Sequence, residues 1–179
     1  MSTMTTYSGK KIDPMYPAKE DICLEDIAHA LSLLCRGGGH LKYFYSVGQH
    51  CINCAREAQA RGYTARVALS CLLHDASEAY LSDVIRPVKE HLSNYLVIER
   101  SIMEVILKAF SLWSLTAEEE KAWRQIDDEM LEHELKAMMA GEEGRNTGQL
   151  SSVPDFRLRE ASAVEKDYLE LARELLSRL

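Results

Sequence analysis

One histidine and three acidic residues interrupt an apolar stretch, "LLHDASEAYLSD", at residues 72–83. They are His74, Asp75, Glu78 and Asp83. An unpaired buried charge costs several kcal/mol, so such groups persist in an interior only when they are paired, neutralised or bound to a metal ion. The sequence therefore predicts that this stretch has a partner elsewhere in the chain.

Two other segments offer the ligands that a metal ion would need. His50 lies at the margin of an apolar helical face. On another helix, Asp127 is in register with Trp123, Met130 and Glu134, which places its carboxylate on the buried stripe of that helix. Zinc, manganese, cobalt and iron ions take imidazole and carboxylate ligands, so the adjacent His74 and Asp75 could be buried at low cost if His50 and Asp127 converged on them. Each residue taken alone is more often a hydrogen-bonded structural residue, but all four together favour a metal site.

Glu78 follows His74 by four residues, which on a helix places both side chains on one face. A carboxylate there could orient a water molecule or act as a general base. The alternative is a structural glutamate that is paired with an arginine. For Asp83, a capping or turn role is an equally good interpretation. Arg86 and Lys89 could hold phosphate oxygens or be solvated surface charges.

These residues must be positioned by helices, because apolar residues recur at helical spacing through most of the chain. The fold class predicted is all-α, a compact bundle of about six helices with the metal site in its core. Capping-box patterns begin two of them, at Ser46 with Gln49 and at Thr116 with Glu119. The predicted helices span residues 21–35, 46–61, 64–81, 91–110, 117–139 and 161–179. The glycines at 37–39 are expected to end the first helix, and Pro87 is expected to break the chain before the fourth. The inward face expected for the second helix is Val47, Cys51, Ala55 and Ala58, and Leu179 is expected on the inward stripe of the last. Residues 1–20 are expected to be extended, with a short hairpin near the N-terminus, and residues 141–153 to form a loop.

The chain of 179 residues has the length of one domain, residues 1–179. Its net charge is −7 and it has no basic run, which disfavours nucleic-acid polymers and anionic membranes as partners. It has no signal-like start and no run of eighteen apolar residues, so we expect a cytoplasmic protein with reduced cysteines. The Cys51–Cys54 CxxC pair lies within a helix, which argues against a redox or zinc motif.

The segments "YSVGQHC", "LLHDASEAYLSDVIRPVK" and "IDDEMLEHE" together resemble the HD-domain phosphohydrolase superfamily. The similarity is to its small nucleotide-hydrolysing members, the phage dATP triphosphohydrolases and the bacterial 5'-deoxynucleotidases, and it spans residues 21–135. By this resemblance the metal ligands are His50, His74, Asp75 and Asp127. Asp128 is the alternative for the last ligand, but Met130 and Leu131 fit the apolar positions that follow the family's final aspartate.

The same resemblance assigns the catalytic carboxylate to Glu78 and substrate contacts to Asp83, Lys89, Arg86 and Arg36. In the family a bulky residue follows this arginine and is implicated in excluding a ribose 2'-hydroxyl. Gly37 stands there in this chain, so selectivity for deoxynucleotides would depend on His40, Tyr43 or Phe44 filling the space.

The expected function is therefore metal-dependent hydrolysis of deoxynucleotides, with a dNTP such as dATP cleaved to deoxynucleoside and triphosphate. A 5'-deoxynucleotidase that acts on monophosphates is the alternative within this chemistry, and a non-catalytic nucleotide-binding regulatory protein is the alternative of another class. The resemblance also implies a small-molecule nucleotide substrate, a divalent transition metal (Co, Mn, Zn or Fe), Mg on the triphosphate, and a homo-oligomer. The region around "LEDIAHALS" is similar to the phage members.

Overall fold

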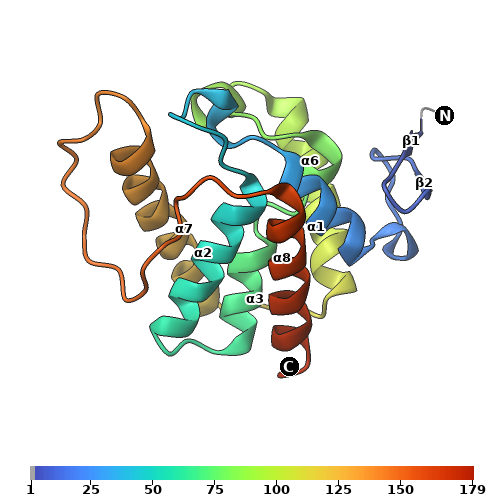
Figure 1. Cartoon of the computed structure of the whole chain (residues 1–179). Coiled ribbons are helices and arrows are strands. Elements are labelled where there is room, and N and C mark those ends of the chain that lie inside the picture. The colour runs from blue at the N-terminus through green and yellow to red at the C-terminus, as the bar shows by residue number, and fades with distance from the viewer. Residues whose placement is uncertain (1–2) are drawn as a thin grey trace.

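The computed structural model describes residues 3–179, and eight α-helices in that part of the chain make up most of the fold (Figure 1). They are α1 (Leu24–Leu33), α2 (Val47–Ala60), α3 (Ala65–Leu73), α4 (Glu78–Leu81), α5 (Arg86–Lys89), α6 (Ser93–Ala109), α7 (Ala117–Met138) and α8 (Ala161–Leu176). Two 3₁₀ turns, η1 (Lys19–Asp21) and η2 (Arg36–Gly39), and a hairpin of β1 (Met4–Thr5) and β2 (Lys11–Ile12) complete the regular structure. The predicted all-α fold is confirmed.

The centre of the molecule is the pair α2 and α3, which pack along each other. Helices α1 and α8 cover one side of this pair, and α7 packs against both helices from another side (Figure 1). The predicted inward face of α2, which is Val47, Cys51, Ala55 and Ala58, is fully buried. These small side chains let neighbouring helices approach α2 closely, and the residues that bear polar groups on α2 are therefore brought near α3 and α7.

The N-termini of the central helices are fixed by side-chain caps. The Ser46 and Thr64 hydroxyls accept hydrogen bonds from Gln49 and Val67 amides and begin α2 and α3. Thr116 and Glu119 form the predicted reciprocal capping box at the start of α7. Gln49 does not complete such a box, because its side chain is hydrogen-bonded to the carbonyl groups of residues 155 and 157 instead.

The prediction of one continuous helix over residues 64–81 was wrong, because the helix is interrupted after Leu73. The His74 imidazole donates a hydrogen bond to the Cys71 carbonyl at 2.7 Å, and the Tyr168 hydroxyl donates one to the Leu72 carbonyl at 2.6 Å. Two carbonyl groups at the end of α3 are thus satisfied by side chains, and the chain continues through residues 74–77 as turns before α4.

Other boundaries also differ from the sequence-based ones. Helix α1 ends at Leu33, before the glycines, because Leu34 and Cys35 are extended and Cys35 forms a β-bridge with Ser46. Pro87 does not only break the chain, since it occupies the first turn of the short helix α5, where its missing amide costs nothing. Leu179, predicted to be inward-facing, lies beyond α8 and is 51% exposed.

Residues 139–160, here called the strap, connect α7 to α8 without helix or strand, as predicted for residues 141–153. In Figure 1 the strap swings outward after α7 and returns across α2 to α8. Three polar residues one turn apart on α2 hold it. Gln49 and Asn53 donate to the Asp155 carbonyl, and the buried Glu57 accepts hydrogen bonds from the residue 151 and 152 amides.

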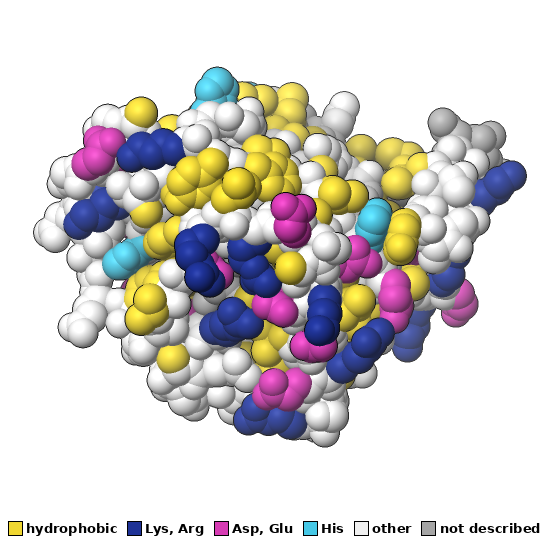
Figure 2. All heavy atoms as spheres, viewed as in Figure 1, with side chains coloured by type: hydrophobic (Ala, Val, Ile, Leu, Met, Phe, Trp, Pro, Cys, Tyr) yellow, Lys and Arg dark blue, Asp and Glu magenta, His cyan; other side chains and the backbone are white. Residues whose placement is uncertain are grey.

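The surface over α8 and the strap carries both signs of charge, which intermingle on the face shown in Figure 2. Arg159 pairs with Asp167 at 2.9 Å, and Arg173 of α8 pairs with Glu25 of α1 at 3.1 Å. Within residues 3–179, no helix combines the length and apolar character that a membrane crossing requires. All five cysteines lie in this part of the chain and are free thiols.

Candidate metal centre

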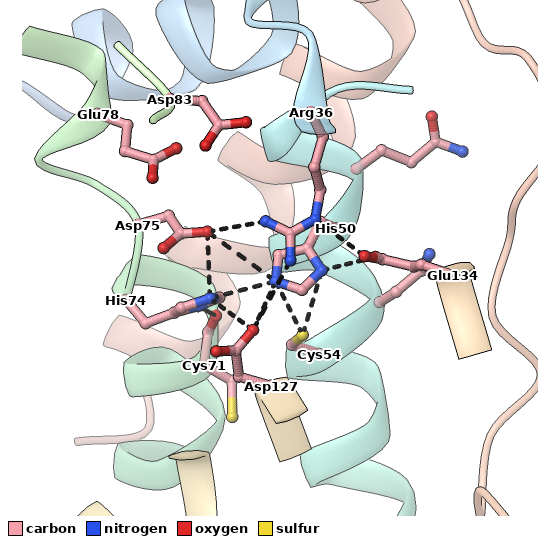
Figure 3. Close-up of polar contacts among 12 residues, drawn as sticks. Arg36, His50, Cys54, Cys71, His74, Asp75, Glu78, Asp83, Asp127 and Glu134 are labelled. Carbon is pink, nitrogen blue, oxygen red and sulfur yellow. Dashed lines mark hydrogen bonds and ion pairs between the residues drawn. The ribbon is translucent and has the colours of Figure 1, made fainter. Parts of the chain in front are cut away.

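Four side chains predicted to bind a metal ion converge at one point, and we refer to them as the metal cluster: His50, His74, Asp75 and Asp127. His50 comes from the middle of α2, His74 from the end of α3, Asp75 from the turn that follows, and Asp127 from α7 (Figure 3). The His50 Nε2 atom lies 3.2 Å from His74 Nε2 and 3.0 Å from Asp127 Oδ1. Asp75 Oδ2 lies 3.2 Å from His74 Nε2 and 3.9 Å from His50 Nε2.

These separations suit a single transition-metal ion. With metal–ligand bonds of about 2.0–2.2 Å, ligand atoms lie roughly 3.3–3.6 Å apart in a tetrahedral site and about 2.8–3.1 Å apart for neighbours in an octahedral one. Five distances among the four facing atoms fall between 3.0 and 3.9 Å. The buried histidine and aspartate groups could therefore hold a metal ion without rearrangement of the helices.

The second nitrogen of each imidazole supports the same conclusion. His50 Nδ1 lies 2.6 Å from Glu134 Oε1, and His74 Nδ1 lies 2.7 Å from the Cys71 carbonyl oxygen. Because both of these partners are acceptors, each Nδ1 carries a proton and donates it. In a neutral imidazole the lone pair is then on Nε2, which is the atom that faces the centre of the cluster. Metal-ligating histidines are characteristically oriented in this way by a carboxylate or a carbonyl group.

The charge of the cluster and its neighbours calls for further positive charge. The carboxylates of Asp75, Asp127 and Glu134 surround a single guanidinium, that of Arg36, which lies 3.3 Å from Asp75 and 2.9 Å from Glu134. Three negative charges and one buried positive charge leave −2 when both imidazoles are neutral. Arg86 also lies 3.7 Å from Asp127, but it is 55% exposed and its charge is balanced by Asp128. One divalent cation, or one proton on each histidine, restores the neutrality that a buried site needs.

The pKa shifts in the protein without metal follow from this arrangement. Burial opposes the charged form of His74, but the negative charges of Asp75 and Asp127 outweigh it and raise the pKa of the imidazole well above its usual value. Burial and Arg36 likewise lower the pKa of His50, while Glu134 and Asp127 raise it, with a net increase. The pKa values of Asp75 and Asp127 fall below their usual range, because the histidine charges exceed the effect of burial.

We therefore expect metal binding to displace protons from His50 and His74. Since the ion competes with up to two protons, its dissociation constant should fall by up to about 100-fold per pH unit below the histidine pKa values and level off above them. Calorimetric titration of Co²⁺ or Mn²⁺ in buffers of different ionisation enthalpy counts the released protons. An affinity that is constant between pH 5.5 and 8, with no proton release, would contradict this coupling.

Glu134 is the most important residue that the sequence-based assignment did not include. It is 2% exposed and accepts hydrogen bonds from three groups: His50 Nδ1, Arg36 Nε at 2.9 Å, and the Tyr45 hydroxyl at 2.9 Å. Burial raises its pKa, but Arg36 and His50 lower it to about 2, so the carboxylate is charged at neutral pH. The signal in the sequence was its spacing, because Glu134 lies two turns after Asp127 on the same face of α7.

Replacing Glu134 should weaken the metal site although this residue is not a ligand. In Glu134→Ala the His50 imidazole loses the acceptor that fixes its orientation, and we expect metal affinity to fall by about 10- to 100-fold, as for other outer-sphere partners. Equilibrium dialysis against Co²⁺ measures this. Tyr45→Phe removes only one neighbour of Glu134 and serves as the milder comparison. An unchanged affinity in Glu134→Ala would show that His50 is oriented by packing alone.

Glu78, the predicted catalytic carboxylate, is buried and only 4% exposed, and its Oε2 atom has no hydrogen-bond partner within the described residues. Its other oxygen lies 3.7 Å from Lys89 Nζ. Burial and the charges of Asp75 and Asp83 raise the pKa of Glu78 to about 9. The alternative of a structural glutamate paired with an arginine does not fit these contacts. In Figure 3 Glu78 and Asp83 lie together beside Asp75, at one edge of the metal cluster.

The other predicted substrate residues are placed differently from one another. Arg36 contacts the carboxylates around the metal cluster directly, at 3.3 Å from Asp75. Asp83 accepts a hydrogen bond from the Gly37 amide at 3.1 Å and so joins the loop after α4 to η2. Gly37 has φ of +66°, a conformation that disfavours a bulky residue, and a Cβ atom there would lie 3.6 Å from Leu41. Leu41 therefore occupies part of the space for which His40, Tyr43 and Phe44 were considered.

Arg86 and Lys89 lie at the two ends of α5. Arg86 is 55% exposed and pairs with Asp128 at 3.1 Å, and it lies 3.7 Å from Asp127. Asp128, the alternative fourth ligand, is 63% exposed and faces away from the cluster, so the structure brings Asp127 into the site instead. Lys89 is held by Glu99 at 2.5 Å.

Cys54 lies against the metal cluster, with Sγ 3.6 Å from His50 Nε2. His50, Cys54 and Asp127 form a second group that could hold a metal ion. Burial raises the pKa of the Cys54 thiol well above its usual value, so it is protonated without a metal ion. The CxxC pair was not assigned a role from the sequence, and Cys51 remains a core residue.

A cavity of about 510 Å³ opens beside the metal cluster and runs between α6 and α7. We refer to it as the α6–α7 cavity. His74, Asp75 and Asp127 line its polar end, and Lys89 is the one predicted substrate residue among its lining side chains within the described chain. A metal ion held by the cluster would therefore border a space large enough for a small organic ligand.

No protein-family model matches the chain. Over 112 residues it is 39% identical to "Uncharacterized protein YfdR" of Escherichia coli K12, which covers 63% of this chain and 60% of that protein. Over 87 residues it is 42% identical to "Uncharacterized protein RCAP_rcc00048" of Rhodobacter capsulatus, which covers 46% of this chain and 44% of that protein. The chain thus spans 60% and 44% of the lengths of these relatives, and neither name states an activity.

Proposed function

We propose that the chain is a metal-dependent phosphohydrolase of the HD-domain type that acts on deoxynucleotides. One observation carries the proposal: two imidazole nitrogens and two carboxylate oxygens face one point, and nearby lies the buried carboxyl group of Glu78, whose Oε2 has no hydrogen-bond partner among residues 3–179. The preferred substrate is a dNTP such as dATP, with deoxynucleoside and triphosphate as products. We further propose a cytoplasmic homo-oligomer, and no nucleic-acid polymer or membrane as partner.

The ion would be held by the metal cluster, which is His50, His74, Asp75 and Asp127. Its two imidazoles favour Co, Mn, Zn or Fe over Mg. We assign Mg to the triphosphate of the substrate. When bound, such an ion supplies a Lewis acid that lowers the pKa of water and offsets the charge of a phosphoryl group. Arg36 and Glu134 keep the ligands in place. Lys89, which borders the cavity, is available to pair with phosphate oxygens, provided that its contact with Glu99 opens.

Glu78 is the group proposed to move a proton. With a pKa of about 9 it holds a proton at neutral pH in the metal-free protein. Positive charge added beside Asp75 would lower this pKa, because the charge of Asp75 is one of the causes that raise it. A carboxyl group whose pKa lies near the working pH can both accept a proton from water and donate one to a leaving oxygen.

The proposal is tested by incubating the Mn²⁺- or Co²⁺-loaded protein with the common deoxynucleotides and ribonucleotides and identifying the products by chromatography. Triphosphate and deoxyadenosine from dATP would support the preferred substrate, and phosphate from dAMP alone would favour the 5'-deoxynucleotidase. Glu78→Gln purified in parallel is the control for contaminating phosphatases. If the metal-loaded protein hydrolyses no nucleotide, the catalytic proposal fails and a binding protein is favoured.

A further inference from the structure

The α6–α7 cavity has a polar end and an apolar end. Asp127, a member of the metal cluster, lines the cavity at one end, and Glu120 lines it two turns earlier on α7, which corresponds to a distance of about 10 Å along the helix. On α6 the lining residues include Leu96 and Glu99, beside Lys89, and extend to Leu107 two turns after Glu99. The lining near the metal cluster is therefore mainly ionic. Farther away, Leu107 and Leu115 form an apolar wall, and Glu120 with its partner Arg124 lies on the α7 side of the cavity.

Among the described residues that line this cavity, one positive charge is unbalanced. Glu99 is paired with Lys89 at 2.5 Å, and Glu120 lies 3.8 Å from Arg124. Arg100 lines the cavity next to Glu99, and it forms no ion pair or hydrogen bond with any of residues 3–179 through its side chain. An arginine that faces a cavity without a carboxylate partner is suited to bind an anion.

We propose that the α6–α7 cavity binds the organic part of a nucleotide, while Arg100 pairs with phosphate charge that the metal cluster leaves unneutralised. This inference rests on the proposed phosphohydrolase function and names the part of the molecule that selects the substrate. The apolar wall is what distinguishes the ligand, because a small sugar phosphate or an inorganic polyphosphate would leave Leu107 and Leu115 without a contact. A volume of about 510 Å³ is in the range of sites for small organic ligands.

Two pairs of variants on α6 test the two ends separately. Leu107→Trp fills the apolar end, and Val97→Trp is its control, because Val97 is 66% exposed and does not line the cavity. Arg100→Ala removes the unpaired charge, and Lys108→Ala is its control on the exposed side of the same helix. Calorimetry measures the binding of dAMP and of inorganic phosphate to each Co²⁺-loaded protein, and circular dichroism confirms that each variant is folded.

We expect Leu107→Trp to weaken dAMP binding by about 10-fold or more, the size of effect that hydrophobic pocket contacts produce, and to leave phosphate binding unchanged. Arg100→Ala should weaken both ligands, and it remains informative if Leu107→Trp does not fold, since Arg100 is an exposed side chain. Both controls should behave as the wild type.

Equal dAMP binding by Leu107→Trp and Val97→Trp would overturn the assignment of the cavity, as would a wild-type protein that binds phosphate but not dAMP. The proposed function is judged separately, by turnover of p-nitrophenyl phosphate. If wild type hydrolyses this small ester and Glu78→Gln does not, a hydrolase is present whatever the cavity binds. If neither hydrolyses it and no nucleotide is turned over, the proposed function fails independently of the binding data.

Discussion

Glu78→Gln is expected to lose turnover and to gain stability. Removal of a general acid or base typically costs about 10²- to 10⁴-fold in rate, and the glutamine keeps the shape of the side chain while it cannot transfer the proton. Stability should rise because Glu78 is a buried carboxyl group whose Oε2 atom has no hydrogen-bond partner in the described part of the chain. Functional residues that weaken the fold in this way are a known cost of activity.

The stability difference between the wild type and Glu78→Gln should depend on pH. The pKa of Glu78 is about 9 in the folded protein and 4.5 in the reference state, so the unfolded chain releases the proton first as pH rises. The wild type therefore loses stability relative to Glu78→Gln between pH 4.5 and pH 9, and the two should converge below pH 4.5. Thermal unfolding of the metal-free proteins from pH 5 to pH 8.5 measures the difference.

Glu104→Gln is the matched control for both measurements, since Glu104 is a solvent-exposed glutamate on α6 and is 61% exposed. It should leave turnover and thermal stability close to those of the wild type. A Glu78→Gln protein that turns over at the wild-type rate would remove Glu78 from the mechanism. A variant that unfolds more easily than the wild type at pH 8 would mean that the carboxylate has a stabilising partner.

Asp127→Asn should abolish metal binding, whereas the same change at the next residue should not. Asp127 contributes Oδ1 to the metal cluster at 3.0 Å from His50, while the Asp128 side chain is 63% exposed and pairs with Arg86. We expect metal affinity to fall by more than about 100-fold in Asp127→Asn, beyond the range for outer-sphere partners, and turnover to be lost with it. Asp128→Asn should stay within a few-fold of the wild type.

The stabilisation of the fold by bound metal distinguishes Asp127→Asn from Asp128→Asn. At a concentration of about 100 times the dissociation constant, a ligand that binds the folded state alone adds about 2.7 kcal/mol to its stability. Co²⁺ should therefore raise the melting temperature of the wild type and of Asp128→Asn but not that of Asp127→Asn. The opposite pattern would make Asp128 the ligand, which is the alternative that the sequence left open.

The arrangement of the fold was predictable where apolar periodicity is strong. The inward face of α2 and the capping box at Thr116 were read correctly, because both are local patterns. The interruption after Leu73 was not predicted, since it depends on the His74 imidazole and the Tyr168 hydroxyl taking carbonyl groups at the end of α3. Tyr168 is almost one hundred residues away in sequence, and no local pattern reveals such a bond.

The metal ligands could be proposed from the sequence because His74 and Asp75 lie in an apolar stretch, where buried ionisable groups must be paired, neutralised or bound to a metal ion. Residues that act by contact with the ligands were harder to assign. Glu134 was seen only as a member of the α7 stripe, and Arg36 was assigned to substrate although it lies among the carboxylates of the site. Both roles depend on distances between α7, η2 and α2. The α6–α7 cavity is likewise a product of helix packing that no single segment encodes.

The most direct test of the account is the position of the ion itself. Crystals grown with Co²⁺ or Mn²⁺ should show one anomalous-scattering peak per chain, about 2.0–2.2 Å from His50 Nε2, His74 Nε2 and a carboxylate oxygen of each of Asp75 and Asp127. A fully loaded crystal without a peak between these four side chains, or with Arg36 filling that position, would contradict the central claim that they form a metal centre.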